Sequence, residues 1–229
     1  MPNVYVIVWE NNMYGNKKVK GHTWPGHSSI NLGDYFDFPR DIYDGVMGIK
    51  NYVSWFPSEG SDFGFKTIFA KKQLGSPNSS LVDDISSEGY YPDHVIRLAV
   101  TDEALAKMKS EWESLRLKAT GASYKAFRKN CSTIVSRILH AGGFAKLKWY
   151  VECNFVWSPA DILRLAVGVG GVQMSWDDFM QHIKASCPKA SPNRYNLTDR
   201  KGRKIEWARD RFFCSTGSAC RFNNGKPVV

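Results

Sequence analysis

The chain has 229 residues, of which 43% are hydrophobic and 14% aromatic, and it carries a net charge of +9. These values favour a folded globular protein with one good core and at most a smaller appendage. No run approaches the roughly 18 apolar residues that a membrane helix needs, so an α-helical membrane span is excluded. The first ten residues show neither a basic region nor a small-residue cleavage site. We therefore expect no signal peptide and, for any export, a dedicated secretion route.

Four segments are predicted to be β-strands, because their apolar and β-branched residues are bounded by Gly, Pro or other turn residues. They cover residues 4–9, 25–33, 51–57 and 94–100. Residues 34–50 are predicted to be an insertion or a long hairpin loop. Residues 58–93 are rich in Ser, Gly, Asp and Asn, and we predict them to be mostly loop.

Four further segments are predicted to be helices. The first follows Thr101 and has apolar residues at helical spacing, and the second begins at Cys131 and ends at a pair of glycines, 142 and 143. The last two begin at Ser158 and Ser175, each of which has an acidic residue three positions later, as in a capping box.

The end of the chain is strongly basic. Residues 185–229 carry ten Lys or Arg residues against three acidic ones, so the rest of the chain carries only +2. A basic extension suits an anionic partner such as a membrane surface, a cell-wall polymer or nucleic acid, and it is equally typical of a solvated tail. We therefore place a boundary near residue 185, with a folded domain over residues 1–184 and a basic C-terminal extension over residues 185–229.

The five cysteines, at positions 131, 153, 187, 214 and 220, form no C-x-x-C pair, so we expect no zinc site. Cys214 and Cys220 can close a short disulfide loop in an oxidising compartment. Because the count is odd, at least one thiol stays free, and Cys131 is the candidate.

Cys131 lies in the first turn of the second predicted helix, on the same side as the apolar residues Ile134, Val135 and Ile138. The free N–H groups of a helix N-terminus favour thiolate over thiol and can donate to an oxyanion. A lone cysteine in such a position is more commonly a small buried hydrophobe, so a nucleophile also needs a base.

His27 is the best placed of the five histidines to be that base. It begins a short strand after Pro25-Gly26, from which a side chain can project over a helix N-terminus. His140 lies nine residues along the cysteine helix, about 13 Å away at 1.5 Å per residue. The other three have no supporting context: His94 lies at the start of a strand, His22 in a loop and His182 on a late helix.

Four segments in this order resemble a known family of cysteine hydrolases: GHSSI at 26–30, YVSWFP at 52–57, NCSTIV at 130–135 and WSPADI at 157–162. Together they are similar to the circularly permuted NlpC-type branch of the papain-like cysteine hydrolases, in which the histidine strand precedes the cysteine helix. That branch includes the lecithin retinol acyltransferase-like enzymes and type VI secretion effectors of the TseH kind. The resemblance covers roughly residues 4–165 and rests on the ordered set of segments.

This resemblance implies an α+β papain-like fold, in which an antiparallel sheet packs against the cysteine-bearing helix, with extra helices and the basic C-terminal extension. It makes Cys131 the nucleophile and His27 the general base. The third residue of the family, which orients the histidine, corresponds to Ser54. A serine orients less well than a carboxylate, so Asp37, Asp34 or a site without a third residue stay open. The N–H of Cys131 would supply one oxyanion donor, and the second has no assignment.

The function implied is that of a cysteine peptidase or amidase, a thiol hydrolase that forms an acyl-enzyme at Cys131. We expect a secreted antibacterial effector that acts on peptidoglycan peptides, with a cognate immunity protein and a secretion-machine component as partners. A protease or deamidase directed at a host protein, or a lipid acyltransferase, are alternatives on the same fold. We therefore expect the protein to be made in the cytoplasm and delivered into a bacterial periplasm or a host cell. No cofactor, metal ion or specific nucleic acid is expected.

A non-enzymatic binder is a different class of function. Four aromatic residues are interleaved with arginines in the extension, as on some nucleic-acid-binding surfaces: Trp207, Phe212, Phe213 and Phe222. Binding to an anionic polymer that weakens steeply with salt and survives Cys131→Ala would favour this class.

Overall fold

A computed structural model describes residues 1–10, 26–34, 51–57, 73–76, 81, 84, 88, 92–117, 123–124, 130–144, 157–175, 177–179 and 181–182. The boundary near residue 185, the basic extension and the cysteines other than Cys131 lie outside these ranges. Within them, no helix combines the length and the apolar character that crossing a membrane requires.

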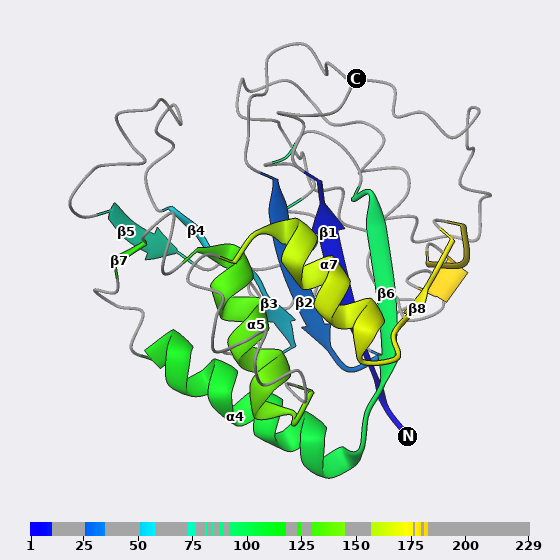
Figure 1. The fold of residues 1–229 in the computed structure, drawn as a ribbon. Coiled ribbons are helices and arrows are strands. Elements are labelled where there is room, and N and C mark those ends of the chain that lie inside the picture. The colour runs from blue at the N-terminus through cyan, green and yellow to red at the C-terminus, as the bar shows by residue number, and fades with distance from the viewer. Residues whose placement is uncertain are drawn as a thin grey trace, which may run out of the picture.

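The fold is α+β and is built on a five-stranded antiparallel sheet with the order β3-β2-β1-β6-β8 (Figure 1). Its strands are β1 (Asn3–Trp9), β2 (His27–Leu32), β3 (Tyr52–Val53), β6 (His94–Ala99) and β8 (Val172–Gln173). The predicted strands at 4–9, 25–33 and 94–100 are thus confirmed within a residue or two. The central strand β1 is buried on both faces, which explains why its sequence is a continuous apolar run.

Three helices cover one face of this sheet (Figure 1). They are α4 (Asp102–Leu117), α5 (Cys131–Ala141) and α7 (Pro159–Gly168), and all three were predicted. Thr101 accepts from the N–H of Ala104 at the start of α4, and Ser158 and Asp161 form a full capping box at the start of α7. The core between the layers contains Val4, Val6, Val8, Ile30 and Leu32 from the sheet, and Ile134, Val135, Ile138 and Leu139 from α5.

The opposite face of the sheet is covered in part by the segment after Ser175. Residues 177–179 and 181–182 are helical, and the Ser175 hydroxyl accepts from the N–H of Asp178, as the capping pattern predicts. Phe179 is fully buried, and its ring lies 6.2 Å from that of Tyr5 on β1. The His182 ring lies 4.9 Å from the same tyrosine ring. The last described helical turn therefore packs on β1.

A second, three-stranded sheet has the order β4-β5-β7 and joins segments far apart in the sequence (Figure 1). Its strands are β4 (Phe56–Pro57), β5 (Gln73–Ser76) and β7 (Ser123–Tyr124). The prediction of one strand over 51–57 was therefore wrong, since residues 52–53 and 56–57 pair in different sheets. The prediction of mostly loop over 58–93 was also wrong where the structure describes it, because β5 and three helical residues, at 81, 84 and 88, lie there.

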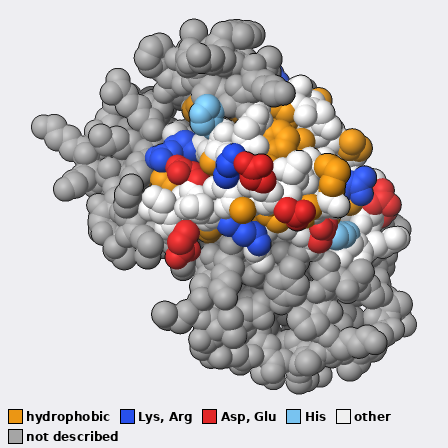
Figure 2. Space-filling view, turned by 90° about the horizontal axis from the view of Figure 1, so that it is seen from below, with side chains coloured by type: hydrophobic (Ala, Val, Ile, Leu, Met, Phe, Trp, Pro, Cys, Tyr) orange, Lys and Arg blue, Asp and Glu red, His pale blue; other side chains and the backbone are white. Residues whose placement is uncertain are grey.

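The described surface around α4 carries charges of both signs. Figure 2 shows Lys, Arg, Asp and Glu side chains interspersed on this face. Lys107 lies 2.6 Å from Glu103 within α4, and Arg137 of α5 lies 2.6 Å from Glu111. Exposed pairs of this kind contribute little to stability, because water and salt screen them. In the part of the chain described, this face is not a basic surface for an anionic polymer.

Candidate active site

The cysteine sits where the first turn of α5 meets the start of β2. Asn130 is the N-cap of α5, and its side-chain oxygen accepts from the N–H of Thr133 at 2.8 Å. Its side-chain N–H₂ donates to the carbonyl of Trp157 at 2.7 Å, just before α7. This residue therefore ties the start of the cysteine helix to the neighbouring helix, and it fixes the position of Cys131, which is 6% exposed.

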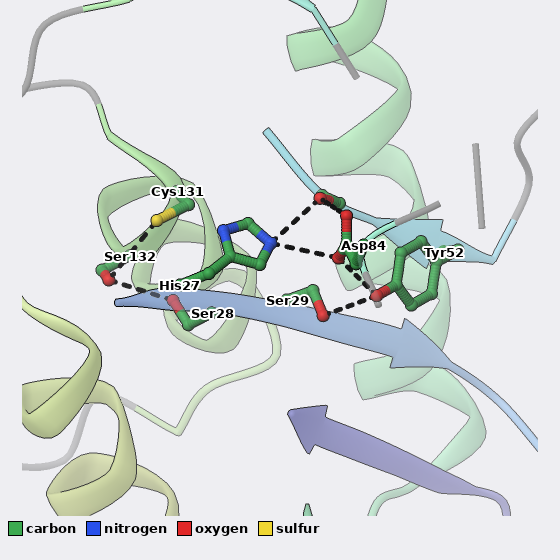
Figure 3. Close-up of polar contacts among 8 residues, drawn as sticks. His27, Ser28, Ser29, Tyr52, Asp84, Cys131 and Ser132 are labelled. Atoms are coloured by element: carbon green, nitrogen blue, oxygen red, sulfur yellow. Dashed lines mark hydrogen bonds and ion pairs between the residues drawn. The ribbon is translucent and has the colours of Figure 1, made fainter. Parts of the chain in front are cut away.

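The imidazole of His27 lies between the cysteine and a carboxylate (Figure 3). Its Nε2 is 3.0 Å from Oδ2 of Asp84, and its other nitrogen faces Cys131. Trp9, paired with His27 across the β1–β2 ladder, has its ring 5.3 Å from the imidazole. Since a carboxylate can only accept, Nε2 carries the proton and donates to Asp84, which leaves Nδ1 free to take the thiol proton.

Asp84 is the residue that sequence reasoning missed. It is fully buried, and it accepts from Nε2 of His27 and the Tyr52 hydroxyl at Oδ2 and from the Ser54 hydroxyl at Oδ1. A carboxylate that receives several hydrogen bonds is held in one orientation. A signal was present in the sequence, because the apolar positions 81, 82 and 85 have helical spacing within the segment predicted to be loop.

Ser54, the predicted third residue, does lie at the site. Val53 pairs with Ile30, so the next residue, Ser54, projects from the same sheet face as His27. Its hydroxyl is 3.2 Å from Nε2 of His27 and donates to Oδ1 of Asp84 at 2.8 Å. The serine thus contacts both the histidine and the carboxylate, and the carboxylate occupies the orienting position that Ser54 was expected to fill.

Asp34, one of the two alternative third residues, is in the wrong place. It lies beyond the far end of β2, which spans about 17 Å from His27 to Leu32 at 3.3 Å per residue. Its carboxylate accepts from the side chain of Asn3 and from the hydroxyl of Tyr5 instead. The other alternative, Asp37, lies outside the described residues.

The electrostatics of the site favour a charged pair. Burial alone would lower the pKa of His27, but the Asp84 carboxylate and the neighbouring Cys131 outweigh it and hold that pKa well above its ordinary value. Burial likewise would raise the pKa of the Cys131 thiol. His27, the backbone N–H of Ser28 and the Ser132 hydroxyl together bring the pKa of this thiol below its ordinary value. Both shifts favour a thiolate beside an imidazolium over the neutral pair.

The first turn of α5 also offers a donor for an oxyanion. The N–H groups of Thr133 and Ile134 are taken by Asn130. Within the described ranges, the N–H of Cys131 has no hydrogen-bond acceptor, as expected for the first residue of a helix. An N–H on the nucleophile itself is well placed to donate to the oxygen of a carbonyl that the sulfur attacks.

The arrangement places a thiol beside an imidazole whose far nitrogen contacts a carboxylate. No group of three or more His, Cys, Asp or Glu among the described residues is arranged to hold a metal ion. A family model described as the IcsB middle domain matches residues 84–187, less than half of the chain. The matched segment includes Asp84 and Cys131 and begins after His27 and Ser54. No curated protein and no solved structure matches. IcsB itself is a secreted effector.

Proposed function

We propose that the protein is a cysteine-dependent acyl-transfer enzyme, a thiol hydrolase of the permuted papain-like class that cleaves an amide bond. The observation that carries this proposal is the line Cys131–His27–Asp84, which places a thiol, a base and an orienting carboxylate in sequence at a helix N-terminus. This is the set of roles that nucleophilic catalysis by a thiol requires.

The reaction would proceed in two halves. The Cys131 thiolate attacks the carbonyl carbon, a C–S bond forms, and the carbonyl π electrons move to the oxygen, which the Cys131 N–H stabilises. As the C–N bond breaks, the His27 imidazolium gives its proton to the departing nitrogen, and a thioester remains. His27 then takes a proton from water as the water oxygen attacks the thioester carbon, and the C–S bond breaks to release the carboxylic acid, which restores the Cys131 thiolate and the His27 imidazolium.

Asp84 would act throughout as the positioning residue. Its carboxylate keeps the His27 proton on Nε2 and stabilises the imidazolium, and Ser54 and Tyr52 hold the carboxylate in place. The role resembles that of the aspartate in the serine hydrolase triad, which orients the histidine and does not itself take a proton.

The proposed setting is that of a secreted effector, which the IcsB middle-domain match supports. Two substrates fit this setting: a peptide of peptidoglycan in a bacterial periplasm, and a protein inside a host cell. A lipid acyltransferase uses the same first half-reaction and differs in the acceptor that resolves the thioester. The line Cys131–His27–Asp84 favours an enzyme over a non-enzymatic binder, because binding alone does not require a thiol, a base and an orienting carboxylate in contact.

Expression in different compartments tests the proposal. Wild type, Cys131→Ala and His27→Ala would be directed to the bacterial periplasm, the bacterial cytosol and the cytosol of a eukaryotic cell, with growth as the readout. Ser136→Ala serves as a control, since Ser136 lies on the same helix and its hydroxyl only donates to the carbonyl of Thr133. Wild type and the control should be toxic in one compartment, and both site variants should be harmless there. Toxicity that survives in Cys131→Ala would overturn the proposal.

A further inference from the structure

Two buried serines meet beside the cysteine and take no part in the reaction above. Ser28 of β2 and Ser132 of α5 are both fully buried, and their hydroxyl oxygens lie 3.0 Å apart. Burying hydroxyls is costly unless each has a hydrogen-bond partner. The pair satisfies part of that need and links the strand of His27 directly to the helix of Cys131.

The pair is also in contact with the sulfur. The Ser132 hydroxyl oxygen is 3.9 Å from Sγ of Cys131, and the backbone N–H of Ser28 donates to the same sulfur. A hydroxyl can accept one hydrogen bond while donating another, whereas a thiolate can only accept. When Cys131 is ionised, the hydrogen bonds must therefore run in one direction: the Ser28 hydroxyl donates to the Ser132 hydroxyl, which donates to the sulfur.

We propose that Ser132, supported by Ser28, is a positioning residue that stabilises the thiolate of Cys131 from the side away from His27. Figure 3 shows Ser132 and His27 on different sides of the sulfur. The inference rests on the proposed role of Cys131 as nucleophile. In this arrangement the thiolate receives donors from two elements: the imidazolium and the Ser28 N–H come from β2, and the Ser132 hydroxyl comes from its own helix.

The alternative role for this hydroxyl is that of the second oxyanion donor. The burial of the pair argues against it, because the oxyanion belongs to a substrate that must enter from solvent, whereas Ser132 and Ser28 have no exposed surface. The two roles also differ in what they change. A thiolate partner alters the ionisation of Cys131, whereas an oxyanion donor alters only the acyl-transfer step.

Alkylation by iodoacetamide, followed at Cys131 by peptide mass spectrometry from pH 5 to 9, tests the inference. Ser132→Ala should slow the reaction near neutral pH by about tenfold, the low end of the effect of losing one hydrogen bond to a charged group. The rate should still reach the wild-type plateau at high pH, where the thiol is fully ionised. Ser132→Thr, which keeps a hydroxyl, should restore most of the rate.

Two further variants complete the design. Ser28→Ala keeps the backbone N–H and removes only the hydroxyl, so it should slow alkylation less than Ser132→Ala. Ser136→Ala, with a buried serine one turn along α5, should match wild type. Near-UV circular dichroism confirms that each variant is folded. If the pH profile of alkylation in Ser132→Ala is identical to that of wild type, the inference is overturned. Slow acyl transfer with such an unchanged profile would assign the hydroxyl to the oxyanion instead. If wild-type Cys131 is alkylated like a free thiol and His27→Ala does not change its rate, the proposed function itself is wrong.

Discussion

Replacement of Asp84 by Asn separates the charge of this residue from its role in orientation. The carboxylate accepts from His27 and Tyr52 at Oδ2 and from Ser54 at Oδ1. An amide whose oxygen occupies the Oδ2 position still accepts hydrogen bonds from His27 and Tyr52. Its N–H₂ then faces Ser54, whose hydroxyl can accept instead of donating. The variant should therefore hold the imidazole in place and remove only the negative charge.

The expected loss follows from the difference between charged and neutral hydrogen bonds. A hydrogen bond to a charged group contributes about 1.5–3 kcal/mol and a neutral one about 0.5–1.5 kcal/mol, so the imidazolium loses roughly 1–2 kcal/mol of stabilisation. The pKa of His27 then falls, and the pKa of Cys131 rises because its ion-pair partner is weaker. Alkylation of Cys131 at neutral pH should slow about tenfold, since 1.36 kcal/mol corresponds to a factor of ten.

Asp84→Ala is the comparison that makes the experiment decisive. It removes the oxygens that accept hydrogen bonds from His27, Tyr52 and Ser54, so the imidazole can rotate. The acyl-transfer rate should then fall by about a hundredfold, the effect of misplacing a catalytic group by about 1 Å. Both rates are measured on folded protein over pH 5 to 9. Equal losses in Asp84→Asn and Asp84→Ala would refute the separation of charge and orientation, and no loss in either would refute any role for Asp84.

Three other predictions concern the support of the site. Asn130→Ala should lower the free energy of unfolding by about 1 kcal/mol or more, because the N-cap of α5 is lost. Asn130→Asp can still cap the helix and should lose only the contact with the Trp157 carbonyl. Urea unfolding followed by circular dichroism distinguishes the two variants, and equal losses would contradict the capping role. Ser54→Ala should slow acyl transfer by about two- to tenfold, less than Asp84→Ala, because His27 and Tyr52 still contact the carboxylate, and a larger loss than in Asp84→Ala would count against the assignment. Ile138→Ala should cost about 2–5 kcal/mol at a fully buried position of α5, and a urea midpoint close to that of wild type would show that the core is described incorrectly.

The parts of the site that the sequence could predict are those with local signals. Cys131 begins a segment with an apolar stripe that ends at a glycine pair, and His27 begins a strand bounded by Pro25-Gly26. In the structure these two residues lie side by side, together with Ser54. Each of them sits within a segment whose periodicity or punctuation marks its element, so its place could be read without knowledge of the rest of the chain.

Asp84 could not be placed in this way, because its role depends on packing between distant segments. It lies 57 positions after His27, in a stretch whose composition resembles loop. Only three helical residues of that stretch are described, and all three are buried: Leu81, Asp84 and Glu88. Three scattered apolar positions, 81, 82 and 85, give a weak periodic signal, and the contact of Asp84 with β2 and β3 is set by the tertiary fold.

The short strands were missed for a similar reason. β5, β7 and β8 have two to four residues each, too few for alternation to be recognised. β8 follows the turn at Gly170, whose positive φ of 95° favours glycine, and a side chain at Gly171 would collide with Ile96 of β6. The glycines at 170 and 171 thus allow the turn that brings β8 alongside β6.

Trapping of the acyl-enzyme tests the central claim most directly. An activated ester such as a p-nitrophenyl ester would be mixed with wild type, Cys131→Ala and His27→Ala, with the release of nitrophenolate and the intact protein mass recorded together. Wild type should release one equivalent in a burst and gain one hydroxylamine-sensitive acyl group on Cys131, His27→Ala should do so far more slowly, and Cys131→Ala should gain none. An adduct of equal yield and rate in all three proteins would contradict the assignment of Cys131 as the nucleophile and His27 as its base.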